Sequence, residues 1–133
     1  MRLGIANVGE VDQIWPLIQA GIQKSCDRGT GEFCAGDFWQ MCRSGNAFLI
    51  LAYDDNEIFM ASVWRFEREE HRHSFHCLTL YGRDMRQWLT PARDFITKLA
   101  RDNGAARLTA CGRSGWLRVF NAATRGDLYE VDI

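Results

Sequence analysis

The sequence lacks the features that mark several specialised classes of protein. Its longest apolar run, residues 47–53, is seven residues long, whereas a membrane-spanning helix needs about 20. No apolar segment follows Met1 and Arg2 as a secretory signal would require. The formal net charge is −1, so overall electrostatics do not drive the chain onto DNA or acidic membranes. We therefore expect a soluble cytoplasmic protein with neither a membrane nor a specific nucleic acid as partner.

The cysteines and histidines also lack the spacing of a structural framework. The five cysteines are odd in number and form no CxxC pair, which argues against both a disulfide scaffold and a zinc ribbon. We expect reduced thiols that pack as small apolar groups. His71, His73, His76 and Cys77 are the densest group of possible metal ligands, but His76 faces away from the others on an extended strand. We expect no metal site.

What is present is the composition of a folded domain with an uneven charge distribution. The 133 residues are 47% hydrophobic and 25% charged, which predicts one domain over residues 1–133. Residues 83–125 hold nine basic and three acidic side chains. Fourteen of the sixteen basic residues are arginine, whose guanidinium makes bidentate contacts with phosphate. This segment is either a local anion site or a solvated helix face.

The hydrophobic pattern predicts alternating strands and helices. The first helix is expected to begin after Asn7 and to end in a loop over residues 26–31, and Asp37 is expected to cap the second. A charged tip over residues 67–73 is expected between the third and fourth strands. The expected strands are residues 2–6, 47–53, 58–67, 74–81, 107–111 and 128–133, and the later helices are 85–104 and 116–123. The order β-α-α-β-β-β-α-β-α-β predicts an α/β protein, a mixed sheet with helices on both faces.

This order resembles the fold of the GNAT family (GCN5-related N-acetyltransferases). Residues 5–17 resemble its first strand and helix, and residues 112–120 resemble the last helix of small GNAT-like proteins encoded by tailed phages. The resemblance implies that acetyl-CoA lies between strands 74–81 and 107–111, with strand N–H groups polarising the thioester carbonyl. Its pyrophosphate would lie at the N-terminus of the next helix. The cofactor-binding residues implied are Leu80, Arg83, Arg86, Arg93 and Arg113.

The sequence departs from the family's pattern at two places. The phosphate-loop pattern Arg/Gln-x-x-Gly-x-Gly/Ala falls on residues 86–91, with Leu89 and Pro91 in its small-residue positions, and Pro91 has no N–H to donate. The tyrosine that protonates the CoA thiolate in many members falls on Ala122, which leaves Tyr129 as the nearby tyrosine. These departures favour a GNAT-fold protein with a degenerate acetyl-CoA site that binds no cofactor.

Two functions therefore remain open. The preferred one is a non-catalytic structural, virion or host-interaction protein of phage type, placed in the host cytoplasm or the virion and bound to a protein partner that Trp39 could contact. The alternative is an active N-acetyltransferase that uses acetyl-CoA on an amine of unknown identity. In that case Glu67, Glu69 and His76 are the candidate bases that deprotonate the amine.

Overall fold

A single mixed sheet runs through the computed structural model, which describes residues 1–29, 32–69, 71–111, 123–125 and 128–133. The seven described strands lie in the order β1-β2-β3-β4-β5-β7-β6, and every neighbouring pair is antiparallel except β4 and β5. The strands are β1 (Arg2–Ala6), β2 (Phe48–Tyr53), β3 (Ile58–Glu69), β4 (Arg72–Gly82), β5 (Arg107–Cys111), β6 (Ala123–Arg125) and β7 (Leu128–Asp132). The helices are α1 (Val8–Arg28), α2 (Ala35–Arg43) and α3 (Met85–Asp102).

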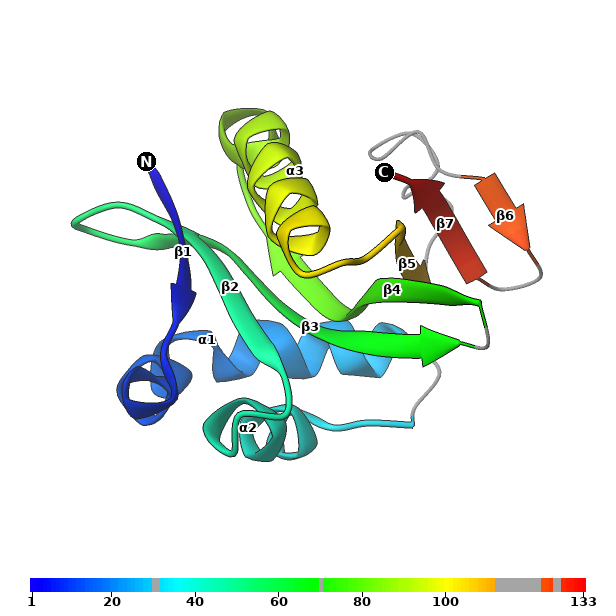
Figure 1. Ribbon diagram of the computed structural model, residues 1–133. Helices are drawn as coiled ribbons and strands as arrows, with labels where there is room; N and C mark the ends of the chain where they lie inside the picture. Colours follow the sequence, from blue (N-terminus) through cyan, green and yellow to red (C-terminus); the bar gives the residue numbers. More distant parts are fainter. Residues whose placement is uncertain (30–31, 70, 112–122, 126–127) are drawn as a thin grey trace.

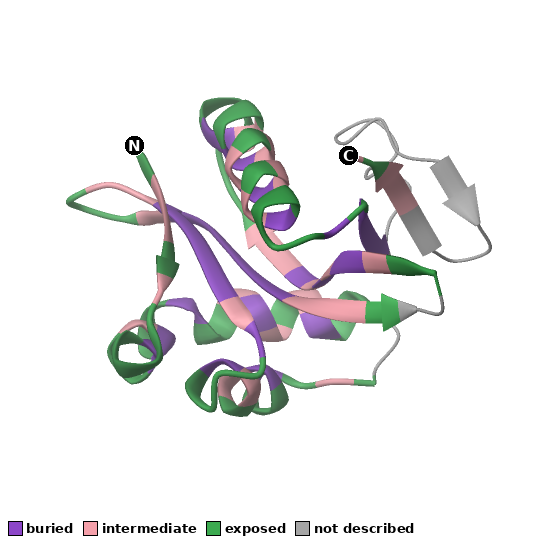
Figure 2. Cartoon of the chain, viewed as in Figure 1, coloured by how far each residue is buried: buried purple, intermediate pink, exposed green. Residues whose placement is uncertain are grey.

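Helices cover both faces of the sheet, as the sequence predicts (Figure 1). Along β2, Leu49 and Leu51 belong to the apolar cluster beneath α1 and α2, whereas Ile50 and Ala52 belong to the cluster beneath α3. Successive residues of a strand point to opposite faces, so a strand covered on both sides is apolar throughout. The apolar run that begins at Ala47 is therefore packed against helices on both faces, and Figure 2 shows this strand buried along most of its length.

The first two helices begin and end at positions that differ in part from the sequence prediction. Asn7 caps α1 as expected, but α1 continues to Arg28 through the first three residues of the predicted loop. The second helix begins at Ala35 with Cys34 as its N-cap, three residues before the predicted cap Asp37. The Asp37 carboxylate instead accepts a hydrogen bond from the Cys34 N–H at 2.8 Å. An acidic residue in the first turn can thus stabilise a helix without being its N-cap residue.

The ends of the later elements differ as well. β3 extends to Glu69 and β4 begins at Arg72, so most of the predicted charged tip belongs to the paired strands. Glu69 and Arg72 are the last residues in register between these two antiparallel strands. The predicted helix over residues 116–123 lies almost wholly outside the described residues, and its last residue begins β6 instead. None of the described helices combines the length and the apolar character needed to cross a membrane.

Candidate functional site

The parallel strands β4 and β5 separate partway along β4. Their pairing ends at Cys77↔Ala110, whereas β4 continues for five more residues to Gly82. On its other edge, β4 has an irregularity where the partners of Trp64 and Val63 are Cys77 and Thr79, so one residue between them is unpaired. A bulge of this kind bends a strand and increases its twist. We call the opening between β4 and β5 beyond Cys77↔Ala110 the splay.

The backbone of Leu80 faces the splay. The Arg83 N–H donates to the Phe59 carbonyl at 2.9 Å. In an antiparallel ladder, hydrogen-bonded and non-hydrogen-bonded pairs alternate, so the pair Ser62↔Leu80 is a non-hydrogen-bonded one. Both backbone groups of Leu80 therefore point away from β3. The Ser25 hydroxyl donates to the Leu80 carbonyl at 3.3 Å, and the Leu80 N–H is directed into the splay.

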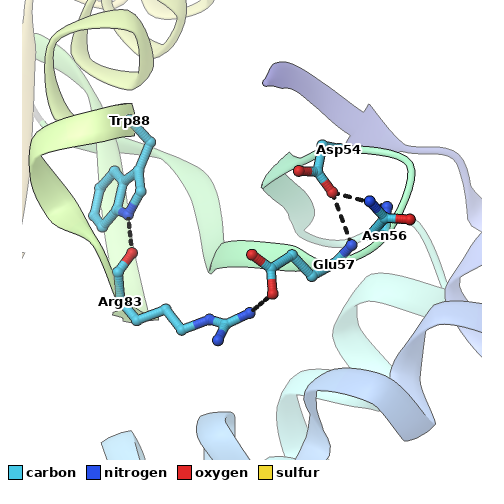
Figure 3. A network of polar contacts seen from close by, with 5 residues as sticks. All are labelled: Asp54, Asn56, Glu57, Arg83 and Trp88. Carbon is cyan, nitrogen blue, oxygen red and sulfur yellow. Dashed lines mark hydrogen bonds and ion pairs between the residues drawn. The ribbon is translucent and has the colours of Figure 1, made fainter.

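A tight turn leads from β4 into α3 at the end of the splay. A Cβ at Gly82 would lie 2.7 Å from Trp88 Cζ2 and 2.9 Å from the Phe59 carbonyl oxygen, so this position requires glycine. Asp84 adopts a left-handed conformation with φ 54° and ψ 46°, and its side chain does not cap the helix. The Trp88 indole donates to the Arg83 carbonyl at 2.7 Å (Figure 3). These contacts fix the position of the α3 N-terminus, which carries partial positive charge.

The arginines implied by the resemblance lie in or near this turn and differ in whether they form an ion pair. The Arg83 guanidinium forms an ion pair with Glu57 at the β2–β3 hairpin and lies 5.8 Å from the centre of the Phe59 ring. Arg86 is exposed in the first turn of α3, and Arg93 is half-buried about two turns further along. Neither Arg86 nor Arg93 forms an ion pair with the part of the chain that the structure describes. The prediction for Arg113 falls outside the described residues.

The candidate bases lie on the paired half of β4 and its neighbours. His76 Nδ1 is 2.7 Å from the Thr109 hydroxyl, and His76 directly precedes the last residue that pairs with β5. At about 3.3 Å per residue, His76 is roughly 13 Å from Leu80. Glu67 lies further out, opposite Ser74, and accepts a hydrogen bond from Arg65 Nε at 3.0 Å. Of the predicted bases, His76 is therefore nearer than Glu67 to the splay.

The remaining predicted base is Glu69, which lies next to the group of possible metal ligands at residues 71–77. Glu69 is the last residue of β3, and its side chain is outside the described part of the structure. Within the described ranges, no three His, Cys, Asp or Glu residues are grouped so that they could hold a metal ion.

A buried polar network beside His76 is not evident from the sequence. Arg107 is 1% exposed. Its Nε donates to the Ser74 hydroxyl at 2.8 Å, and its terminal nitrogen donates to Glu130 Oε2 at 2.7 Å. The network joins β4, β5 and β7 on the face opposite α3. The one signal in the sequence is an arginine that begins the otherwise weakly polar strand at residues 107–111.

The buried thiols do not have the environment of nucleophiles. Burial raises the pKa of Cys42 to about 12. Burial also raises the pKa of Cys77, on β4 beside the splay, although the Thr79 backbone partly opposes the shift. A thiol must ionise to react, so these two side chains act as packing groups at neutral pH. The side chain of Cys111 lies outside the described residues.

Trp39 is part of an α1–α2 contact. Its indole N–H donates to Asp12 at 2.8 Å, and the Arg43 guanidinium lies 4.5 Å from the centre of its ring. Asp12 also forms an ion pair with Arg43 at 3.3 Å. The sequence predicts Trp39 as a contact for a protein partner, whereas in the structure its half-buried side chain joins two helices of its own chain.

Solved structures identify the fold, whereas neither the family models nor the curated proteins yield a match. A GNAT family acetyltransferase from Brucella melitensis in complex with acetyl-CoA aligns with TM-score 0.68 and 12% identity, covering 99% of this chain and 87% of that one. A ribosomal-protein-alanine N-acetyltransferase from Brucella melitensis biovar Abortus 2308 aligns with TM-score 0.65 and 12% identity, covering 95% and 94%. A predicted acetyltransferase with acetyl-CoA from Clostridium acetobutylicum aligns with TM-score 0.65 and 8% identity, covering 90% and 86%. The chain therefore has the GNAT fold.

Proposed function

We propose that the protein binds acetyl-CoA in the splay and transfers its acetyl group to an amine. The observation that carries this proposal is the Leu80 N–H, which points away from β3 into the splay, where no strand among the described residues pairs with it. Solved neighbours of the same fold were obtained with acetyl-CoA. The α3 N-terminus and the exposed Arg86 lie at the end of the splay and suit the phosphates of such a ligand.

The chain offers a group for each requirement of acetyl transfer except the acid. Acetyl-CoA, when bound, supplies an acyl group activated as a thioester. The Leu80 N–H donates to the acyl oxygen and stabilises negative charge that develops there. His76 lies too far along β4 from Leu80 to touch the attacking amine, so it accepts the amine's proton through intervening water while the carbon–sulfur bond breaks. Water protonates the departing thiolate, since Ala122 stands in the position of the family's tyrosine.

A second candidate is the non-catalytic role, in a virion or on a host component. The observation that favours it is the state of Arg83, whose guanidinium is already neutralised by Glu57 and whose N–H is already bonded to Phe59. Pro91, in the second turn of α3, also has no N–H to donate. Such a protein would keep the fold and bind a protein partner, without acetyl transfer.

The proposed reaction is tested with acetyl-CoA and a pool of peptides that carry different amino termini, with acetylated products detected by mass spectrometry. Leu80→Pro removes the N–H that faces the splay, and it leaves the ladder to β3 bonded because that N–H does not point toward β3. Leu80→Ala removes the side chain but keeps the N–H, so it measures packing alone. We expect Leu80→Pro to lose far more product than Leu80→Ala. Equal losses would contradict the role given to the Leu80 N–H, and no product from the unmodified protein would favour the non-catalytic role.

A further inference from the structure

The β2–β3 hairpin places an acidic side chain against the turn that begins α3. The Asp54 carboxylate accepts the N–H groups of Asn56 and Glu57 at 2.8 and 2.9 Å, and the Asp54 N–H donates to the Glu57 carbonyl at 2.9 Å. These backbone hydrogen bonds hold the pKa of Asp54 below its usual value. The hairpin tip is thereby fixed through its backbone, and the Glu57 side chain extends to the Arg83 guanidinium (Figure 3).

Arg83 is held in place independently of this ion pair. Its N–H donates to the Phe59 carbonyl, and its own carbonyl accepts from the Trp88 indole. The guanidinium is therefore attached to a rigid backbone and remains solvent-accessible, with side-chain exposures of 58% for Arg83 and 40% for Glu57. An exposed ion pair of this kind contributes little to stability. It can exchange partners without unfolding the turn.

We propose that Glu57 lowers the affinity of the protein for the phosphates of its CoA ester by competing for Arg83. This inference rests on the proposed function and adds to it a residue that sets ligand affinity. In the free protein the Arg83 charge is neutralised by Glu57. A phosphate group at the α3 N-terminus must displace the Glu57 carboxylate before Arg83 can contribute to binding. Arg83, the first arginine of the positively charged segment 83–125, is thus already paired before any phosphate binds.

The test compares ligand affinities of three variants by calorimetric titration, with acetyl-CoA and with inorganic pyrophosphate as separate probes. Glu57→Gln keeps the backbone of the hairpin and frees Arg83. We expect it to bind both probes about two- to five-fold more tightly than the unmodified protein, the range that an exposed ion pair can supply. The gain should shrink at high ionic strength, because exposed charges are then screened. Asp55→Asn is the matched control, since Asp55 lies on the same hairpin but pairs with Arg2.

The third variant, a double substitution, shows whether the tighter binding depends on Arg83. Glu57→Gln combined with Arg83→Gln should lose the tighter binding that Glu57→Gln alone produces. If the Glu57 carboxylate instead weakened binding through its general electrostatic field, the tighter binding would remain in the double variant. A gain with pyrophosphate but no binding of acetyl-CoA would support this inference and contradict the proposed function. The inference is overturned if Glu57→Gln binds no better than Asp55→Asn, if it binds more weakly, or if no variant binds either probe.

Discussion

At the scale of single residues, Gly21 permits a close contact between α1 and the sheet. A Cβ at this position in α1 would lie 2.3 Å from the ring of Tyr81 on β4. Gly21→Ala is expected to destabilise the protein by roughly 1–3 kcal/mol, because overpacking outweighs the better helix propensity of alanine. Chemical denaturation measures the change. Gly36→Ala is the control, since its nearest neighbour would be Cys34 Sγ at 3.7 Å. Equal effects at the two glycines would contradict this explanation.

Arg107 is the buried charge on which three strands depend. Its ion pair with Glu130 and hydrogen bond to Ser74 lie in a nearly dry environment, with side-chain exposures of 2% for Arg107 and 21% for Glu130. Arg107→Met is expected to destabilise the protein by roughly 2–4 kcal/mol, because Glu130 loses its partner. Arg2→Met breaks an exposed pair with Asp55 and should change the free energy of unfolding by about 0.5 kcal/mol or less. Urea unfolding of both variants decides the comparison.

At the scale of elements, α3 tolerates a proline in its interior. Pro91 is exposed on α3 and cannot donate to the carbonyl one turn earlier. Pro91→Ala is expected to stabilise the protein by about 1–2 kcal/mol, since restored helix bonding outweighs the greater freedom of the unfolded chain. Thermal unfolding measures the change. An unchanged or lower midpoint would contradict this expectation.

The sequence predicts those elements whose stability comes from one local pattern. The apolar face of α3 and the strand after Ala47 can both be predicted from the spacing of their apolar residues. Each of these elements is stabilised by burying its own apolar side chains. The direction of the Leu80 N–H cannot be predicted from the sequence, because it depends on the register of β4 with β3 and on the bulge in β4. The ion pair of Glu57 with Arg83 joins residues 26 positions apart, and local spacing carries no information about such a contact.

At the scale of the whole molecule, buried thiols make the free energy of unfolding fall as the pH becomes alkaline. Burial raises the pKa of Cys42 from 9.0 to about 12. A pKa that is higher in the folded state contributes stability below the unfolded value, and this contribution is lost as the pH rises through the folded value. The free energy of unfolding should therefore fall between pH 9 and about 12. Cys42→Ala should show a shallower decline over this range, and identical slopes would contradict the assignment.

The central claim is that a GNAT fold without the usual glycines still binds acetyl-CoA in its splay. Calorimetric titration of the full chain with acetyl-CoA, beside Arg86→Ala, tests it most directly. Arg86 is exposed in the first turn of α3, where charge-assisted contacts to phosphate are strong. We expect saturable one-to-one binding that Arg86→Ala weakens by about ten-fold, or roughly 1.4 kcal/mol. No heat of binding at millimolar acetyl-CoA would contradict the claim and leave a fold that has lost its ligand.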